Sequence, residues 1–211
     1  MGHAHKIGRS LITAAAFTMI AAGTTVGQND KKPDFPKFEE VAKDYEKVVS
    51  TADGAQSFYT VWTREKDGQM LAELPRNYEK QKQWFAMTVG AGETYAGLQG
   101  RDMYVYWKRY DKRVALMAPE IGTRSTGDQE SKDSVEKIFT DRVILDLPIE
   151  CIGPNGQPVI DLDNLLAGNA STFFGGSARG ANTRLLNIAS AKAFPKNIEI
   201  AIEMPVAGGT L

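Results

Sequence analysis

Histidine and cysteine, the side chains that most often carry catalysis or bind metals, are scarce in this chain of 211 residues. His3 and His5 are the only histidines, and Cys151 is the only cysteine. Zinc hydrolases, serine and cysteine nucleophiles and acid–base pairs at neutral pH normally depend on imidazole. Because both histidines lie in the first five residues, we expect the rest of the chain to hold no catalytic residue, no metal site and no cofactor.

A glycine-rich stretch, residues 173–180, is the obvious place to look for a phosphate-binding loop or a nucleophile elbow. A Walker loop ends in Gly-Lys-Ser or Gly-Lys-Thr, and an elbow needs Gly-x-Ser-x-Gly. Here Arg179 stands where the second glycine of the elbow belongs, and no histidine is available to activate Ser177. We therefore interpret residues 168–182 as a mobile surface loop, anchored by its two phenylalanines, and keep Arg179 as a candidate ligand contact.

Asp161, Asp163 and Asn164 carry oxygen atoms of the kind that hard cations prefer. An EF-hand loop beginning at Asp161 needs Gly at its sixth position and Glu at its twelfth. Leu166 and Thr172 stand at those positions instead. We therefore expect Asp161 or Asp163 to cap a short helix.

One aromatic and basic group resembles a platform for a sugar or a single-stranded nucleic acid. It consists of Tyr104, Tyr106 and Trp107 with Lys108 and Arg109. Alternate side chains of a strand share a face, so Tyr104 and Tyr106 lie together and Trp107 lies opposite. One face must be core, so at most half of this group is available to a ligand. The three aromatic residues are the remaining candidate ligand contacts.

The beginning of the chain has the order of an export signal. Lys6 and Arg9 form a basic start, an apolar centre covers residues 11–22, and small residues follow. This order is typical of a secretory signal peptide, and the apolar centre is shorter than the roughly 20 residues of a membrane span. We expect a cleaved signal over 1–27, a polar tether over 28–37, and a periplasmic or extracellular protein without a stable membrane span.

Composition then restricts the class of the exported protein. Cleavage of the signal would remove Lys6 and Arg9 and change the formal net charge from −1 to −3. A mildly acidic protein has no basic surface that would attract nucleic acid. Cys151 is too far from the signal to carry a lipoprotein anchor, and a single cysteine forms no internal disulfide. We expect one domain over residues 38–211 with a hydrophobic core of its own.

Hydrophobic periodicity predicts the elements of this domain. Apolar residues recur at helical spacing over 38–49, and from residue 57 onward the pattern alternates as in strands. We expect a short helix over 134–139 after an exposed loop at 122–132. The predicted strands cover 57–63, 70–74, 84–89, 103–108, 113–118, 143–152, 159–162, 185–193 and 198–204. The predicted class is α+β, dominated by an antiparallel β-meander and hairpins, with an N-terminal amphipathic helix and a few short helices.

Seven short segments occur in a characteristic order. They are residues 57–62 (SFYTVW), 67–75 (DGQMLAELP), 84–90 (WFAMTVG), 105–109 (VYWKR), 141–150 (DRVILDLPIE), 159–162 (VIDL) and 190–199 (SAKAFPKNIE). In this order they resemble an uncharacterised N-terminal region that precedes the catalytic domain in large exported bacterial zinc-dependent metalloproteases of the metzincin type. The resemblance covers nearly all of the expected mature chain.

This resemblance implies a role without catalysis. The family's zinc signature, H-E-x-x-H-x-x-G-x-x-H, has no counterpart in the sequence, so no catalytic or metal residue carries over. We expect an accessory or pro-region-like domain that shapes, covers or presents substrate to a protease domain absent here, with zinc only in that domain. Its partner would be the downstream protease domain or a protein or peptide substrate. Residues 206–211 look like the start of another hairpin, so we expect an incomplete reading frame or a stand-alone remnant.

Two other functions stay open at this point. One is a free-standing envelope module that binds a glycan or a peptide on an exposed aromatic sheet face. The other is a hydrolase that uses two carboxylates converging in a cleft, which only geometry can reveal.

Overall fold

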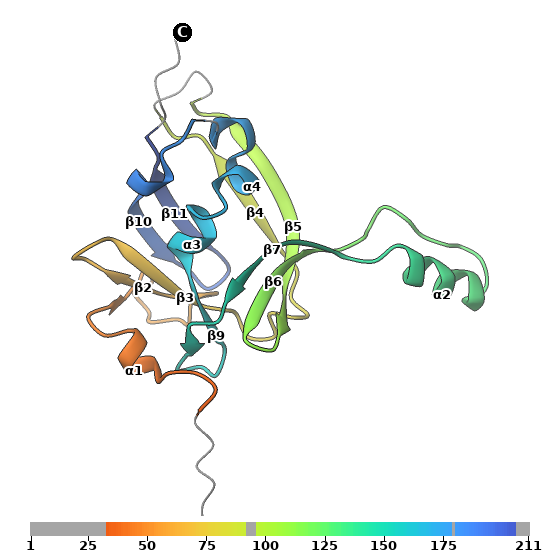
Figure 1. Ribbon diagram of the computed structural model, residues 1–211, viewed down its shortest axis with the longest axis horizontal. Helices are drawn as coiled ribbons and strands as arrows, with labels where there is room; N and C mark the ends of the chain where they lie inside the picture. The colour runs from red at the N-terminus through yellow and green to blue at the C-terminus, as the bar shows by residue number, and fades with distance from the viewer. Residues whose placement is uncertain (1–32, 92–95, 179, 206–211) are drawn as a thin grey trace, which may run out of the picture. The chain divides into compact units, whose positions relative to one another are not determined.

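Antiparallel strands dominate the computed structural model, which describes residues 33–91, 96–178 and 180–205 (Figure 1). The described residues, from Pro33 onward, belong to one compact unit. The predicted signal peptide, residues 28–32 of the predicted tether and Arg179 lie outside the described residues. Among the described residues, no helix is long and apolar enough to cross a bilayer.

The described strands form three antiparallel sheets. The first has the order β1 (Glu46–Lys47), β2 (Thr60–Arg64), β3 (Gln69–Glu73), β9 (Pro158–Asp161) and β8 (Cys151–Ile152). The second is a meander of β4 (Gln83–Thr88), β5 (Gln99–Tyr110), β6 (Arg113–Ala118) and β7 (Arg142–Pro148). The third pairs β10 (Asn187–Ala193) with β11 (Ile198–Glu203). The predicted dominance of antiparallel meander and hairpins is confirmed.

Turn residues account for the tight hairpins. Gly68 between β2 and β3 and Gly156 between β8 and β9 have φ of +68° and +80°, which an L side chain rarely adopts. Asp111 takes φ +51° between β5 and β6. The predicted strand 143–152 is divided at Pro148, so that β7 and β8 belong to different sheets.

The predicted amphipathic helix over 38–49 is wrong. Only α1 (Phe38–Val41) is helical, Asp44 takes φ +66°, and β1 then pairs with β2. The apolar pattern is nevertheless satisfied, because Phe38, Val41, Ala42 and Tyr45 pack on a small cluster formed by Trp62, Leu71, Cys151 and Val159. A helical turn followed by a left-handed bend therefore packs most of the apolar residues of the predicted helix against the core, whereas Val49 is 68% exposed.

The loop predicted over 168–182 is also wrong in part. It contains α4 (Ala170–Phe174) and a 3-10 turn, Gly175–Ala178. Phe173 is fully buried and Phe174 packs against the core, as their anchoring role requires. α3 (Leu162–Leu166) begins with the predicted cap, since the Asp161 side chain accepts a hydrogen bond from the backbone N–H of Asn164 at 3.0 Å.

The main core lies between the inner face of the β4–β7 sheet and the other two sheets. Its members include Val105 and Trp107 of β5, Leu116 of β6 and Ile160 of β9, all at most 1% exposed. The indole N–H of Trp107 donates to the Tyr59 hydroxyl at 2.8 Å, so its polar atom is satisfied inside the core.

Among the described residues, the core also holds one buried carboxylate, that of Glu73. Glu73 is 1% exposed and accepts hydrogen bonds from the turn between β8 and β9. The donors are the backbone N–H of Asn155 at 2.8 Å, its side-chain amide at 2.7 Å and the backbone N–H of Gln157 at 3.1 Å. Three donors replace the water that this carboxylate would otherwise bind.

Between β6 and β7 the chain leaves the sheet as an arm, residues 119–141, which carries α2 (Gln129–Ile138) (Figure 1). The Asp128 side chain caps this helix by accepting from the backbone N–H of Ser131 at 2.9 Å. α2 therefore starts earlier than the predicted helix over 134–139, and none of its residues is buried. The loop predicted over 122–132 is helical from residue 129.

Candidate functional site

The outer face of the β4–β7 sheet collects the aromatic residues that do not enter the core. Strand alternation places Tyr104, Tyr106, Lys108 and Tyr110 of β5 on this face, opposite the buried Trp107. Of the three predicted aromatic contacts, the structure therefore leaves two for a ligand and assigns Trp107 to the core. The fourth predicted contact, Arg179, lies outside the described residues.

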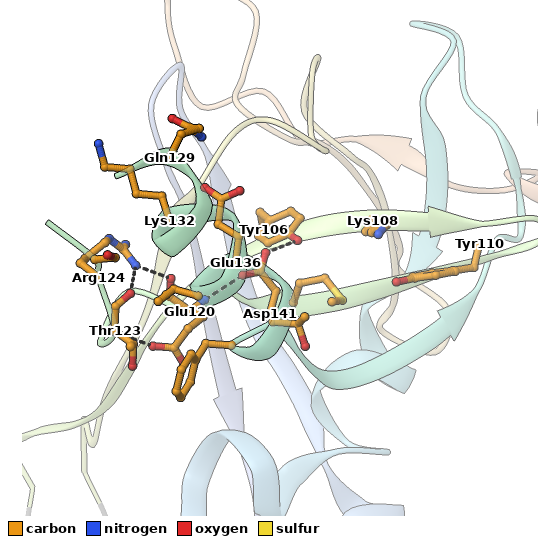
Figure 2. Close-up of a pocket in the computed structure, with 15 residues that line it drawn as sticks. Tyr106, Lys108, Tyr110, Glu120, Thr123, Arg124, Gln129, Lys132, Glu136 and Asp141 are labelled. Carbon is orange, nitrogen blue, oxygen red and sulfur yellow. Dashed lines mark hydrogen bonds between the residues drawn. The ribbon is translucent and has the colours of Figure 1, made fainter. Parts of the chain in front are cut away.

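A groove of about 860 Å³ lies between this face and the arm (Figure 2). One wall is the β5 row Tyr106, Lys108 and Tyr110, and the other comes from residues 120–141 of the arm. On α2, the residues that line it are Gln129, Lys132, Val135 and Glu136. Their spacing of three to four residues is that of one helix face. The volume is within the range of roughly 300–1,000 Å³ that is usual for ligand sites.

Asp141 fixes the base of the arm to the sheet. Its carboxylate accepts a 2.6 Å hydrogen bond from the Tyr106 hydroxyl and a 2.8 Å bond from the backbone N–H of Glu120. Figure 2 shows Asp141 between these two partners. One side chain thereby connects β5 with both ends of the arm, which gives the groove a defined wall.

The two hydrogen-bonded groups have shifted pKa values in opposite directions. Burial, together with the hydrogen bond to Asp141, raises the pKa of Tyr106 to about 12. Burial acts to raise the pKa of Asp141, but the hydrogen bonds from Tyr106 and Glu120 outweigh it and lower that pKa. At neutral pH the pair is therefore a tyrosine hydroxyl donating to a carboxylate. A carboxyl group held ionised in this way is a poor general acid.

A second aromatic feature lies on the same face outside the groove. Trp84 of β4 is 64% exposed, and its ring centre lies 4.9 Å from that of Tyr104. The β4–β5 register places these two residues directly opposite each other. Sequence reasoning missed Trp84 as a partner of Tyr104, because only the strand pairing brings the two rings together.

The part of the chain that the structure describes holds no assembled metal site and no activated nucleophile. No group of three or more His, Cys, Asp or Glu side chains lies close enough there to hold a metal ion. Cys151 is fully buried, and burial raises the pKa of its thiol to about 11. The low thiolate content and the lack of access both disfavour nucleophilic chemistry at this residue.

Comparison with known proteins identifies one family. Residues 97–208, a little over half of the chain, match the model of a domain of unknown function, DUF5117. Comparisons with curated proteins and with solved structures find no match. The matched range contains the whole groove, from Tyr106 to Asp141, whereas Trp84 precedes it. The chain belongs to the DUF5117 family.

Proposed function

We propose that this chain is a non-catalytic accessory domain of an exported zinc metalloprotease and that it holds a polypeptide in the groove between the arm and the β4–β7 sheet. The observation that carries the proposal is the groove itself, which combines the half-buried Tyr106 ring and the exposed Tyr110 ring with many hydrogen-bonding groups and a fixed wall. A polypeptide has apolar side chains for the rings and main-chain donors and acceptors for the polar groups.

The protease association is supported by the ordered resemblance of seven segments to the region that precedes metzincin catalytic domains. A domain in that place either presents substrate to the protease or covers the protease itself, and both roles require binding of polypeptide. The predicted export signal fits the same role, because such proteases act outside the cytoplasm.

Two measurements test the absence of catalysis. The purified chain should retain no stoichiometric zinc after dialysis, and it should not cleave casein. Robust proteolysis that a chelator abolishes would refute the non-catalytic part of the proposal. An in-frame extension of the coding sequence that reaches the zinc signature would establish the association with a protease domain, and an extension without it would count against that association.

Polypeptide binding is tested with a permanently unfolded probe, fluorescein-labelled α-lactalbumin whose cysteines are reduced and alkylated. We expect saturable binding by fluorescence anisotropy, weakened at least fivefold by Tyr110→Ala in the groove. Trp84→Ala is the matched control, because it removes another exposed aromatic ring from the same face outside the groove. Equal loss in both variants, or no binding by the wild-type chain, would contradict the assignment of the groove.

A glycan-binding module is the second candidate function, and the exposed Trp84 ring beside Tyr104 favours it. Aromatic rings on a flat sheet offer apolar faces against which sugar rings stack. Quenching of tryptophan fluorescence by chito-oligosaccharides, lost in Trp84→Ala and kept in Tyr110→Ala, would select this function. The two single variants thus separate the candidates.

A further inference from the structure

The helix on the arm, α2, has one uncharged face that the described residues leave open. With about 3.6 residues per turn, the uncharged side chains at spacings of three and four fall on one side of the helix. They are Ser131, Ser134, Val135 and Ile138, which we call the α2 stripe. The other six residues of α2 are all polar and fall on the opposite side. Ser131, Ser134 and Ile138 are exposed, and Val135 is half-buried at the edge of the groove.

Exposed apolar side chains are concentrated on the same arm. Nine large hydrophobic residues are exposed in the described part of the chain. Four of them lie on the arm or at its base, namely Ile121, Ile138, Phe139 and Val143, and Ile138 is 70% exposed. Such a concentration is typical of a surface that contacts another protein. Figure 1 shows α2 on the arm, to the side of the sheets, where a second molecule has access to it.

The α2 stripe complements itself in size. If a second copy of α2 packs antiparallel about a two-fold axis between residues 134 and 135, Ser131 faces the second copy's Ile138 and Ser134 faces its Val135. Each small side chain then lies opposite a large one, which lets the two helices approach closely without voids. A parallel pair would set Ile138 against Ile138 and Ser131 against Ser131, and would leave a gap beside each serine.

The charges beside the stripe match in the same arrangement. Glu130 and Lys137 are seven residues apart, so they lie on the same flank of the stripe. Like flanks face each other in an antiparallel helix pair, so Glu130 approaches the second copy's Lys137, and the two-fold axis repeats this contact. On the other flank, Lys132 approaches the second copy's Phe139, a contact of a cation with an aromatic ring.

From this double match we propose that the chain forms a homodimer through antiparallel pairing of the α2 stripe. A second copy is favoured over an unrelated partner because one sequence supplies both halves of the size match and of the charge match. The contact uses the same surface on both copies, so it closes at two. The inference goes beyond the proposed polypeptide binding and does not depend on it, because only Val135 of the stripe lines the groove.

The area of contact limits the expected affinity. A helix of ten residues is about 15 Å long, so an α2 pair covers less than the roughly 800 Å² per partner of a stable interface. We therefore expect a reversible dimer with a dissociation constant on the order of tens of micromolar.

Sedimentation equilibrium of the purified chain between about 5 and 500 μM tests the pairing. The mean mass should rise with concentration from that of a monomer toward that of a dimer. Ile138→Asp places a carboxylate in the centre of the contact and should weaken the association by at least about tenfold. Val49→Asp is the matched control, because Val49 is 68% exposed and lies outside the arm; it should leave the association unchanged.

A mixing experiment tests the antiparallel arrangement. Glu130→Lys leaves two lysines on the flank, and Lys137→Glu leaves two glutamates. Each variant alone should associate about tenfold more weakly than the wild type, because both charge contacts become repulsive. An equimolar mixture of the two variants should recover nearly the wild-type association, since each lysine then meets a glutamate of the other chain.

Each other outcome overturns the inference. A chain that stays monomeric over the whole range refutes the second copy and leaves the stripe to a different protein. Equal association of Ile138→Asp and Val49→Asp places any dimer contact elsewhere. Charge variants that associate like the wild type, or that do not recover on mixing, refute the antiparallel register, and masses above that of a dimer refute the closed contact. The polypeptide-binding proposal is tested separately by Tyr110→Ala, so the two proposals fail independently.

Discussion

Removal of the buried Glu73 carboxylate should destabilise the protein more than loss of any exposed charge. The side chain is 1% exposed and joins β3 to the turn between β8 and β9. Replacement by alanine, Glu73→Ala, takes away the acceptor for three donors, two of which are backbone N–H groups of that turn. Glu65→Ala, at an exposed position in the turn after β2, is the matched control.

The magnitude follows from the three hydrogen bonds. A hydrogen bond to a charged group contributes a net of about 1.5–3 kcal/mol. Asn155 is an exposed residue, so water can replace part of the lost bonding, and the lower end of that range applies. Glu73→Ala also removes the free-energy cost of burying a carboxylate, and this gain offsets part of the stability lost with the hydrogen bonds. We expect the free energy of unfolding to fall by about 3 kcal/mol, a large part of the roughly 5–15 kcal/mol typical of a domain.

Urea unfolding followed by tryptophan fluorescence measures this change. Gly153→Ala tests the same network, because a Cβ there would lie 2.5 Å from the Glu73 carboxyl carbon. In the Glu73→Ala background that clash is absent, so the cost of Gly153→Ala should be much smaller than in the wild type. A loss below about 1 kcal/mol for Glu73→Ala, or additive effects of the two substitutions, would refute the reasoning.

Three further results follow from the structure. Burial raises the pKa of Tyr59 to about 12 from an ordinary 10.0, so between those pH values the unfolded chain releases a proton that the folded chain keeps, and stability falls as pH rises by about 1.4 kcal/mol per unit. Urea titrations across this interval should show the slope, and Tyr59→Phe should reduce it by that amount; an unchanged slope contradicts the assignment. Tyr106→Phe removes the hydrogen bond to Asp141 and should cost about 1 kcal/mol while amide exchange in the arm accelerates; exchange at the wild-type rate would show that the bond does not fix the arm. The Cys151 thiol, buried and with its pKa raised to about 11, should react with a thiol reagent only as urea unfolds the chain; rapid labelling of the native protein would disprove its burial.

The hairpins could be predicted from the sequence because their signals are local. Asp67-Gly68 and Asn155-Gly156 stand between alternating segments, and the structure places a turn at each. The helix over 38–49 failed for the opposite reason. Apolar spacing shows which residues are buried, but the bend at Asp44 and the pairing of β1 with β2 depend on residues about 15 positions away.

The groove could not be predicted, because no local motif encodes it. Its walls come from β5 and from an arm that begins after β6, and the two meet only once Asp141 binds Tyr106. The alternation of side chains along a strand correctly placed Tyr106 and Trp107 on opposite faces of β5. It could not show which residues of the arm lie against Tyr106. One signal was overlooked: Asp128 is a residue type that commonly caps helices, and it stands immediately before the first residue of α2.

The pairing of β3 with β9 has a consequence for the limits of the family itself. Residues 71–73 form the neighbouring strand for residues 159–161, and β4 pairs with β5 across a hairpin that contains residue 97, where the family match begins. A fragment starting at residue 97 would lose both partners and expose two open sheet edges, the usual starting point for aggregation. The folding unit in this chain therefore begins well before the recognised family boundary, and expression of the domain should include the strands that precede it.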